Sequence, residues 1–98
     1  MPYVRVVIKT SDKPQKKYKA IFYDKENKTK KIYFGSAGMS DFTKHRDEKR
    51  KQRYIDRHKK RENWDVPDTA GSLSRWILWN KPTLRASIED YKKRFNLK

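Results

Sequence analysis

Hydrophobic and polar residues alternate along the first third of the chain. Val4, Val6 and Ile8 stand at every second position, a pattern typical of a strand with one apolar face. Two further runs of aromatic and β-branched residues, 18–23 and 30–34, follow turn-forming segments. The pattern predicts a three-stranded antiparallel meander within residues 1–35. The residues expected on its inward face are Val4, Val6, Ile8, Tyr18, Ala20, Phe22, Ile32 and Phe34. This apolar face requires a layer of helices over it.

Residues 41–62 contain no glycine or proline and are rich in helix-forming residues. They predict one long helix, with Ser40 or Asp41 as the N-cap. The segment 35–40 before it holds two glycines and is interpreted as a turn from strand to helix. A phosphate cradle built from its backbone N–H groups is the weaker alternative.

The remainder of the chain predicts two shorter helices within residues 69–95. The first runs from about Ala70 to Trp79, and the second follows Thr83 as its cap. The fold class is therefore α+β: a three-stranded antiparallel sheet packed by one long basic helix and two shorter C-terminal helices. We expect residues 1–98 to form a single domain.

The charge of the chain changes this picture most. Lys and Arg number 27 against 12 Asp and Glu, a formal net charge of +15 on 98 residues. Such self-repulsion costs stability unless a polyanion lies nearby. The expected partner is nucleic acid, with DNA favoured over RNA, although an anionic protein or a lipid headgroup would satisfy the same charge.

Two further absences narrow the class of protein. The chain has no cysteine, which excludes disulfides and thiolate metal sites and points to reducing surroundings. Its apolar runs are far shorter than the roughly 18 residues that span a bilayer, so we expect a soluble protein with no membrane partner. The oligomeric state stays open.

The predicted long helix carries a stripe of arginines. Spacings of four, three, four and four residues place five of them on one face. A guanidinium grips phosphate oxygens at two points, so the stripe predicts a phosphate-binding surface, with three lysines assisting. The candidate nucleic-acid-binding residues are Arg46, Lys49, Arg50, Arg53, Arg57, Lys59, Lys60 and Arg61. The alternatives are a solvated helix face and contact with an acidic protein neighbour.

Catalytic residues are not recognisable in this sequence. His45 and His58 are 13 positions apart, roughly 20 Å on one helix, too far to share a metal. Charge pairing along the helix accounts for the carboxylates of the 41–62 segment. We therefore expect no enzymatic activity, no metal and no cofactor.

Tyrosines accompany the basic residues of the predicted sheet. Tyr3, Tyr23 and Tyr33 occupy odd positions of the chain. The lysines beside them are Lys17, Lys19 and Lys31. Exposed on a sheet, they would form a stacking surface for single strands. We interpret these rings mainly as packing residues instead.

Four segments carry a resemblance to a known family: FGSAGMSDFTKH at 34–45, YIDRHKKRENW at 54–64, TAG at 69–71 and SRWILWNKP at 74–82. Over residues 34–98 the chain resembles a family of small basic, poorly characterised proteins encoded by giant double-stranded DNA viruses (nucleocytoplasmic large DNA viruses) and some algae. The resemblance implies a viral setting, either with the packaged genome or in the capsid shell. It supplies no catalytic residues, and the N-terminal strands lie outside it.

The function predicted from charge, spacing and resemblance is DNA binding without sequence specificity. We expect it in the virion, neutralising or condensing genome phosphates, and in the host cytoplasm or nucleus during infection. One alternative is a structural or cementing virion protein that binds acidic capsid or core proteins through anchors at Trp64, Trp76 and Trp79. A second alternative is RNA binding.

Overall fold

The computed structural model describes residues 3–98, and its first part is a β-meander. Strands β1 (Tyr3–Thr10), β2 (Lys16–Asp24) and β3 (Thr29–Ser36) form one antiparallel sheet in the order β1-β2-β3. Short turns join them, as antiparallel neighbours allow. The β2–β3 turn is closed by the Asp24 carboxylate, which accepts the amides of Glu26 and Lys28. The predicted three-stranded antiparallel sheet is confirmed.

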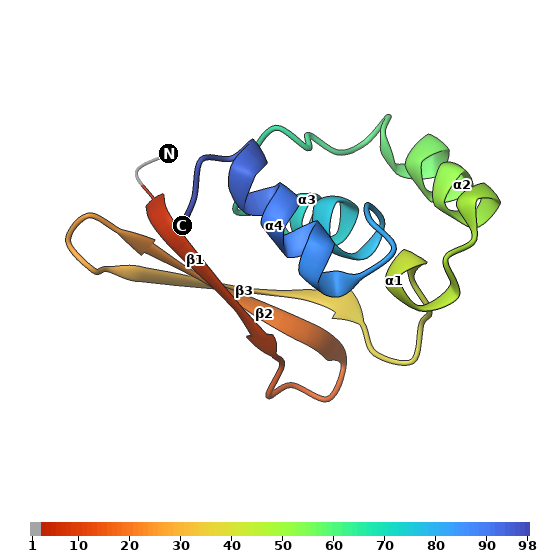
Figure 1. Cartoon of the computed structure of the whole chain (residues 1–98). Helices are drawn as coiled ribbons and strands as arrows, with labels where there is room; N and C mark the ends of the chain where they lie inside the picture. The colour runs from red at the N-terminus through yellow and green to blue at the C-terminus, as the bar shows by residue number, and fades with distance from the viewer. Residues whose placement is uncertain (1–2) are drawn as a thin grey trace.

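Short helical segments make up the rest of the described chain (Figure 1). They are α1 (Phe42–His45), α2 (Glu48–His58), α3 (Ala70–Leu73), the π-helical η1 (Ser74–Leu78) and α4 (Leu84–Arg94). Thr69 and Thr83 cap α3 and α4, each hydroxyl accepting a backbone N–H three residues later. None of the helices in residues 3–98 is long and apolar enough to cross a membrane.

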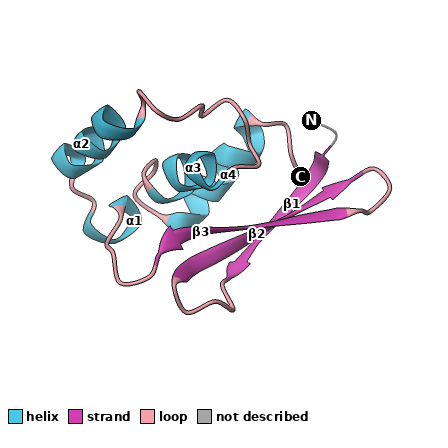
Figure 2. Cartoon of the chain, turned by 180° about the vertical axis from the view of Figure 1, so that it is seen from behind, coloured by secondary structure: helices cyan, strands magenta, loops and turns pink. Residues whose placement is uncertain are grey.

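The core lies between one face of the sheet and the segments α3, η1 and α4, which Figure 2 shows layered over it. The sheet contributes four buried residues, Val6, Ala20, Phe22 and Phe34. From the helical side come Leu73, Ile77, Leu78, Tyr91 and Leu97. The chain's last residues close the outer edge of β1, where the backbone groups of Lys98 exchange hydrogen bonds with Val4 and Val6.

One end of the predicted inward face is wrong. The register between β1 and β2 shifts between Tyr3 and Arg5. Tyr3 therefore turns to the helical side, where its ring lies 5.1 Å from that of Phe22 and its hydroxyl donates to Asp68. Val4 is left 38% exposed instead of joining the core. A register shift changes which side chains face inward, and strict alternation has no means of indicating it.

The prediction of one long helix over residues 41–62 is also wrong. Arg46 adopts a left-handed conformation (φ 53°), and its N–H closes α1 on the carbonyl of Phe42. Asp47 is extended and caps the next helix, accepting the amides of Lys49 and Arg50. The left-handed residue at the end of a helix is usually glycine, and arginine rarely adopts this conformation. The sequence therefore lacks the usual sign of a helix end at Arg46.

The basic helix also does not pack on the sheet as predicted. A cavity of about 420 Å³ separates α2 from β3, with Tyr54 and His58 on one wall and Phe34 on the other. Within α2 only Tyr54 is buried. A helix needs an apolar stripe to cover a sheet, and α2 has too few apolar residues to supply one.

Candidate nucleic-acid interface

The arginine stripe survives in a shorter form. Arg50, Arg53 and Arg57 share one face of α2, at spacings of three and four residues. Arg46 lies before the helix and Arg61 beyond its end, in a turn. At 1.5 Å per residue α2 is about 16 Å long, half the length expected of the predicted helix. The prediction that all five arginines line a single helix is therefore wrong.

All five of these arginines are exposed, and none of them forms an ion pair with a carboxylate of residues 3–98. Of the five, only Arg46 has a side-chain hydrogen-bond partner within residues 3–98: its Nε donates to the carbonyl of Pro82 at 3.0 Å. The three arginines on α2 are exposed and their side chains have no hydrogen-bond partner within residues 3–98, although Arg57 also lines the cavity beside Tyr54. We call Arg50, Arg53 and Arg57 the arginine face.

The carboxylates of α2 are occupied by lysines and by an amide. Glu48 lies 3.4 Å from the ammonium of Lys51, and Asp56 lies 3.7 Å from that of Lys59. Asp56 also accepts a hydrogen bond from Gln52. Local pairing thus explains the acidic residues of the helix and spares the arginine face.

The three predicted assisting lysines are all exposed, but they surround α2 unequally. Lys49 stands in its first turn, two residues after the Asp47 cap. Lys59 is its C-cap and is already paired, and Lys60 lies in the turn beyond. They broaden the positive surface around the arginine face rather than extend its line.

The cap that starts α2 is ionised more readily than an ordinary aspartate. The N–H of Arg50, with that of Lys49, lowers the pKa of the Asp47 carboxyl. The amide of Asp47 in turn donates to Nδ1 of His45. The bend between α1 and α2 is thereby hydrogen-bonded on both sides.

Tyr54 attaches α2 to the body of the protein. Its ring stacks on that of Trp79 at 4.5 Å with 4° between the planes, and on His58 at 4.2 Å. Burial raises the pKa of the Tyr54 phenol well above its ordinary value, so the ring stays neutral. The sequence predicted that the basic helix packs on the sheet, whereas Tyr54 packs on Trp79. Trp79 is the contact that the sequence analysis missed.

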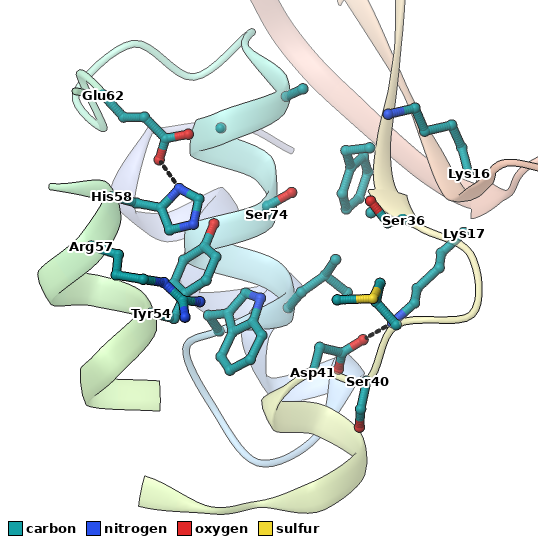
Figure 3. Close-up of a pocket in the computed structure, with 17 residues that line it drawn as sticks. Lys16, Lys17, Ser36, Ser40, Asp41, Tyr54, Arg57, His58, Glu62 and Ser74 are labelled. Carbon is teal, nitrogen blue, oxygen red and sulfur yellow. Dashed lines mark hydrogen bonds and ion pairs between the residues drawn. The ribbon is translucent and has the colours of Figure 1, made fainter. Parts of the chain in front are cut away.

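Figure 3 shows the cavity between α2 and the β3–α1 connection, with paired charges on its walls. The Lys17 ammonium lies 2.6 Å from the Asp41 carboxylate, which also accepts the amide of Thr43 as the N-cap of α1. On the other wall His58 Nδ1 lies 3.5 Å from the Glu62 carboxylate. Asp41 was one of the two predicted caps, and this part of the prediction is confirmed.

The histidines and tryptophans singled out in the sequence lie among packed aromatic rings. In the described residues no group of three or more His, Cys, Asp or Glu is placed to hold a metal ion. His45 and His58 each pack against an aromatic ring, Trp79 and Tyr54 respectively. Trp64 lies edge-on to Trp76, whose indole N–H donates to the Trp64 carbonyl. The tryptophans are thus engaged within the molecule.

The family model of a family of unknown function, DUF5754, matches residues 6–58, more than half of the chain. The chain belongs to this family. The matched part of this DUF5754 protein contains nearly all of the sheet, α1 and α2, and so includes the arginine face. No curated protein and no solved structure matches the chain.

Proposed function

We propose that this DUF5754 protein binds nucleic acid without sequence specificity, with duplex DNA as the preferred form, and that the arginine face of α2 contacts the phosphates. One observation carries the proposal: three exposed guanidiniums share a helix face and have no carboxylate partner within residues 3–98. A guanidinium fork matches two phosphate oxygens, and its contacts carry no sequence information.

The surrounding charge supports the same partner. The net charge of +15 gives a long-range attraction for a polyanion, and binding would release the counterions condensed on it. Over the seven residues from Arg50 to Arg57 the helix rises about 10 Å, so the three side chains reach neighbouring positions on one stretch of backbone. Lys49 and Lys60 flank that stretch.

The proposed setting is the virion, where the protein neutralises or condenses packaged genome phosphates, and the host cytoplasm or nucleus during infection. This part rests on the resemblance of residues 34–98 and on the cationic composition. RNA presents the same phosphates and is the second candidate ligand. A cementing role through Trp64, Trp76 and Trp79 would require rings that already have intramolecular contacts.

A salt series of fluorescence-anisotropy titrations with duplex DNA tests the proposal. The variant R50Q/R53Q/R57Q removes the arginine face, and K25Q/R85Q/K93Q removes the same charge from three exposed positions elsewhere. Each neutralised phosphate contributes about 0.9 to the slope of log affinity against log salt. We expect the arginine variant to lower that slope by about 3 and the control variant by less than about 1.

Two results would overturn the proposal. A wild-type slope near zero means that no phosphates are neutralised. Equal losses in the two variants mean that net charge acts without the arginine face. A fall in slope confined to R50Q/R53Q/R57Q supports phosphate contact by α2.

A further inference from the structure

The sheet has a second face, opposite the core, which no described helix covers (Figures 1 and 2). Figures 1 and 2 show the helical segments gathered on the other side of the strands. Cross-strand pairing places Arg5 beside Tyr23, and Lys9 beside Lys19, which is itself beside Tyr33. Side chains alternate between the two sides of a strand, so these residues share the uncovered side. We define the open sheet face by Arg5, Lys9, Lys19, Tyr23, Lys31 and Tyr33.

The centre of this face is apolar and its surroundings are cationic. Val7 pairs with Ile21, which pairs with Lys31, and both aliphatic side chains are only half-buried. Five cations lie on or beside the face when Lys13 is counted. Among residues 3–98, Asp12 at its edge is the single carboxylate that bonds to the residues of this face. A ligand that fits this face therefore combines negative charge with flat, weakly polar groups.

The two tyrosines are held flat enough for cations to lie over their rings. The guanidinium carbon of Arg5 is 3.7 Å from the ring centroid of Tyr23, and Lys13 Nζ is 4.3 Å from that of Tyr33. The hydroxyl of Tyr33 donates to Asp12 at 2.7 Å, which fixes the ring on the sheet. A base could stack on the guanidinium plane or replace the cation over the ring, leaving that cation to pair with phosphate.

We propose that the open sheet face binds single-stranded nucleic acid by stacking bases on Tyr23 and Tyr33, with phosphates held by the surrounding lysines and Arg5. The two rings stand four residues apart along the strand direction, about 13 Å. A duplex hides its base faces and would leave the rings and the Val7–Ile21 centre unused. An acidic protein surface offers charge but no planar bases. This inference rests on the proposed function, since it gives nucleic acid a second surface of different chemistry.

Binding of an oligothymidylate at moderate salt tests the inference. The variant Y23L/Y33L keeps apolar bulk but removes the rings, whereas Y23F/Y33F keeps the rings and loses the hydroxyls. We expect the leucine variant to bind the oligonucleotide at least about tenfold more weakly, and the phenylalanine variant to bind within about twofold of wild type. Affinity for duplex DNA is expected to stay unchanged in both. Equal binding by wild type and the leucine variant would overturn the inference.

Two measurements on the wild-type protein keep the inference testable if the leucine variant folds poorly. Amide chemical-shift changes on adding oligothymidylate are expected in β1, β2 and β3, and changes confined to α2 would contradict it. Polyglutamate carries charge without bases, and displacement of oligothymidylate at equal charge concentration would also contradict it. If the wild-type protein binds oligothymidylate but not duplex DNA, the arginine-face proposal fails and this inference stands, so the two proposals fail separately.

Discussion

The arginine face of α2 and the open sheet face are both cationic, yet their surroundings differ. On α2 the three guanidiniums form no cation–π pair and no ion pair with a carboxylate within residues 3–98. On the sheet, Arg5 and Lys13 lie over tyrosine rings around an apolar centre. We therefore propose that the two cationic regions serve different ligands, phosphates alone on α2 and phosphates with bases on the sheet.

The two regions also differ in how they are held. The open sheet face is the reverse side of the core, whose residues Phe22 and Phe34 are fully buried. The arginine face stands on a helix attached mainly through Tyr54, beside a cavity. Loss of a core residue such as Phe22 should therefore destabilise the whole protein, whereas loss of Tyr54 should loosen α2 locally.

The largest expected effect comes from the core beneath the sheet. Phe22→Ala removes a ring with no exposed surface. We expect the free energy of unfolding to fall by about 3–5 kcal/mol, because the loss of buried area is combined with a cavity. Urea denaturation followed by circular dichroism measures it. A loss below about 1 kcal/mol would show that the sheet is not the anchored region.

Tyr54→Ala should have a smaller and more local effect. The ring is 7% exposed and stacks on Trp79 and His58, so we expect a loss of about 2–3 kcal/mol. Hydrogen exchange should accelerate in α2 far more than in β2. Equal acceleration in both elements would erase the distinction between the two regions.

Replacing the three arginines of α2 by lysine sharpens the chemical side of the comparison. R50K/R53K/R57K keeps the charge but loses the planar fork. We expect duplex affinity to fall roughly threefold to tenfold while the salt slope stays the same. Anisotropy titrations measure both quantities. Unchanged affinity would mean that α2 acts only as a cluster of point charges.

The smallest expected effect is a loss of folding stability at low pH. It arises at Asp90, which belongs to neither cationic face. Burial alone would raise the pKa of the Asp90 carboxyl, but hydrogen bonds from Asn80 and Arg94 outweigh it and the pKa is lowered. A lowered pKa in the folded state stabilises the protein at neutral pH, and this contribution is lost as pH falls through and below the ordinary value of 3.8.

Unfolding measured between neutral pH and about pH 3 checks this expectation, with D90N as the comparison. The variant should lose less stability on acidification than the wild type. Parallel curves for the two proteins would contradict the role of Asp90.

Sequence reasoning succeeded where a simple period governs the structure. Alternation located the sheet and most of its inward face, because a side chain facing the core must be apolar on a two-sided strand. It failed at Tyr3 and Val4, where a register shift changes the side that faces inward. That shift depends on pairing with β2, which alternation within β1 does not reveal.

The helical region was harder to predict, because single residues rather than a repeating pattern determine where its helices begin and end. Composition over 41–62 favours helix throughout, and the break depends on one left-handed arginine and one capping aspartate. Asp47 followed by Glu48 is a helix-start signal that could have suggested a second N-terminus. The Nε of Arg46 also donates to the carbonyl of Pro82, a tertiary contact that local sequence does not show.

The candidate binding residues were predicted in part. Helical spacing correctly grouped Arg50, Arg53 and Arg57, but the break before Glu48 excludes Arg46 from their helix and its end at His58 excludes Arg61. The open sheet face was underrated because aromatic residues on strands usually pack. Arg5 beside Tyr23 was the missing signal, since the cross-strand neighbour shows which tyrosines remain outside the core.

A gel-shift competition at physiological salt with the wild-type protein tests the central claim most directly. Labelled duplex DNA is challenged with unlabelled duplex, single-stranded DNA, structured RNA and polyglutamate. We predict a retarded complex that unlabelled duplex displaces best, that single strands displace in part, and that polyglutamate displaces poorly. The absence of any retarded complex, or displacement by polyglutamate as efficient as by DNA, would contradict nucleic-acid binding by this protein.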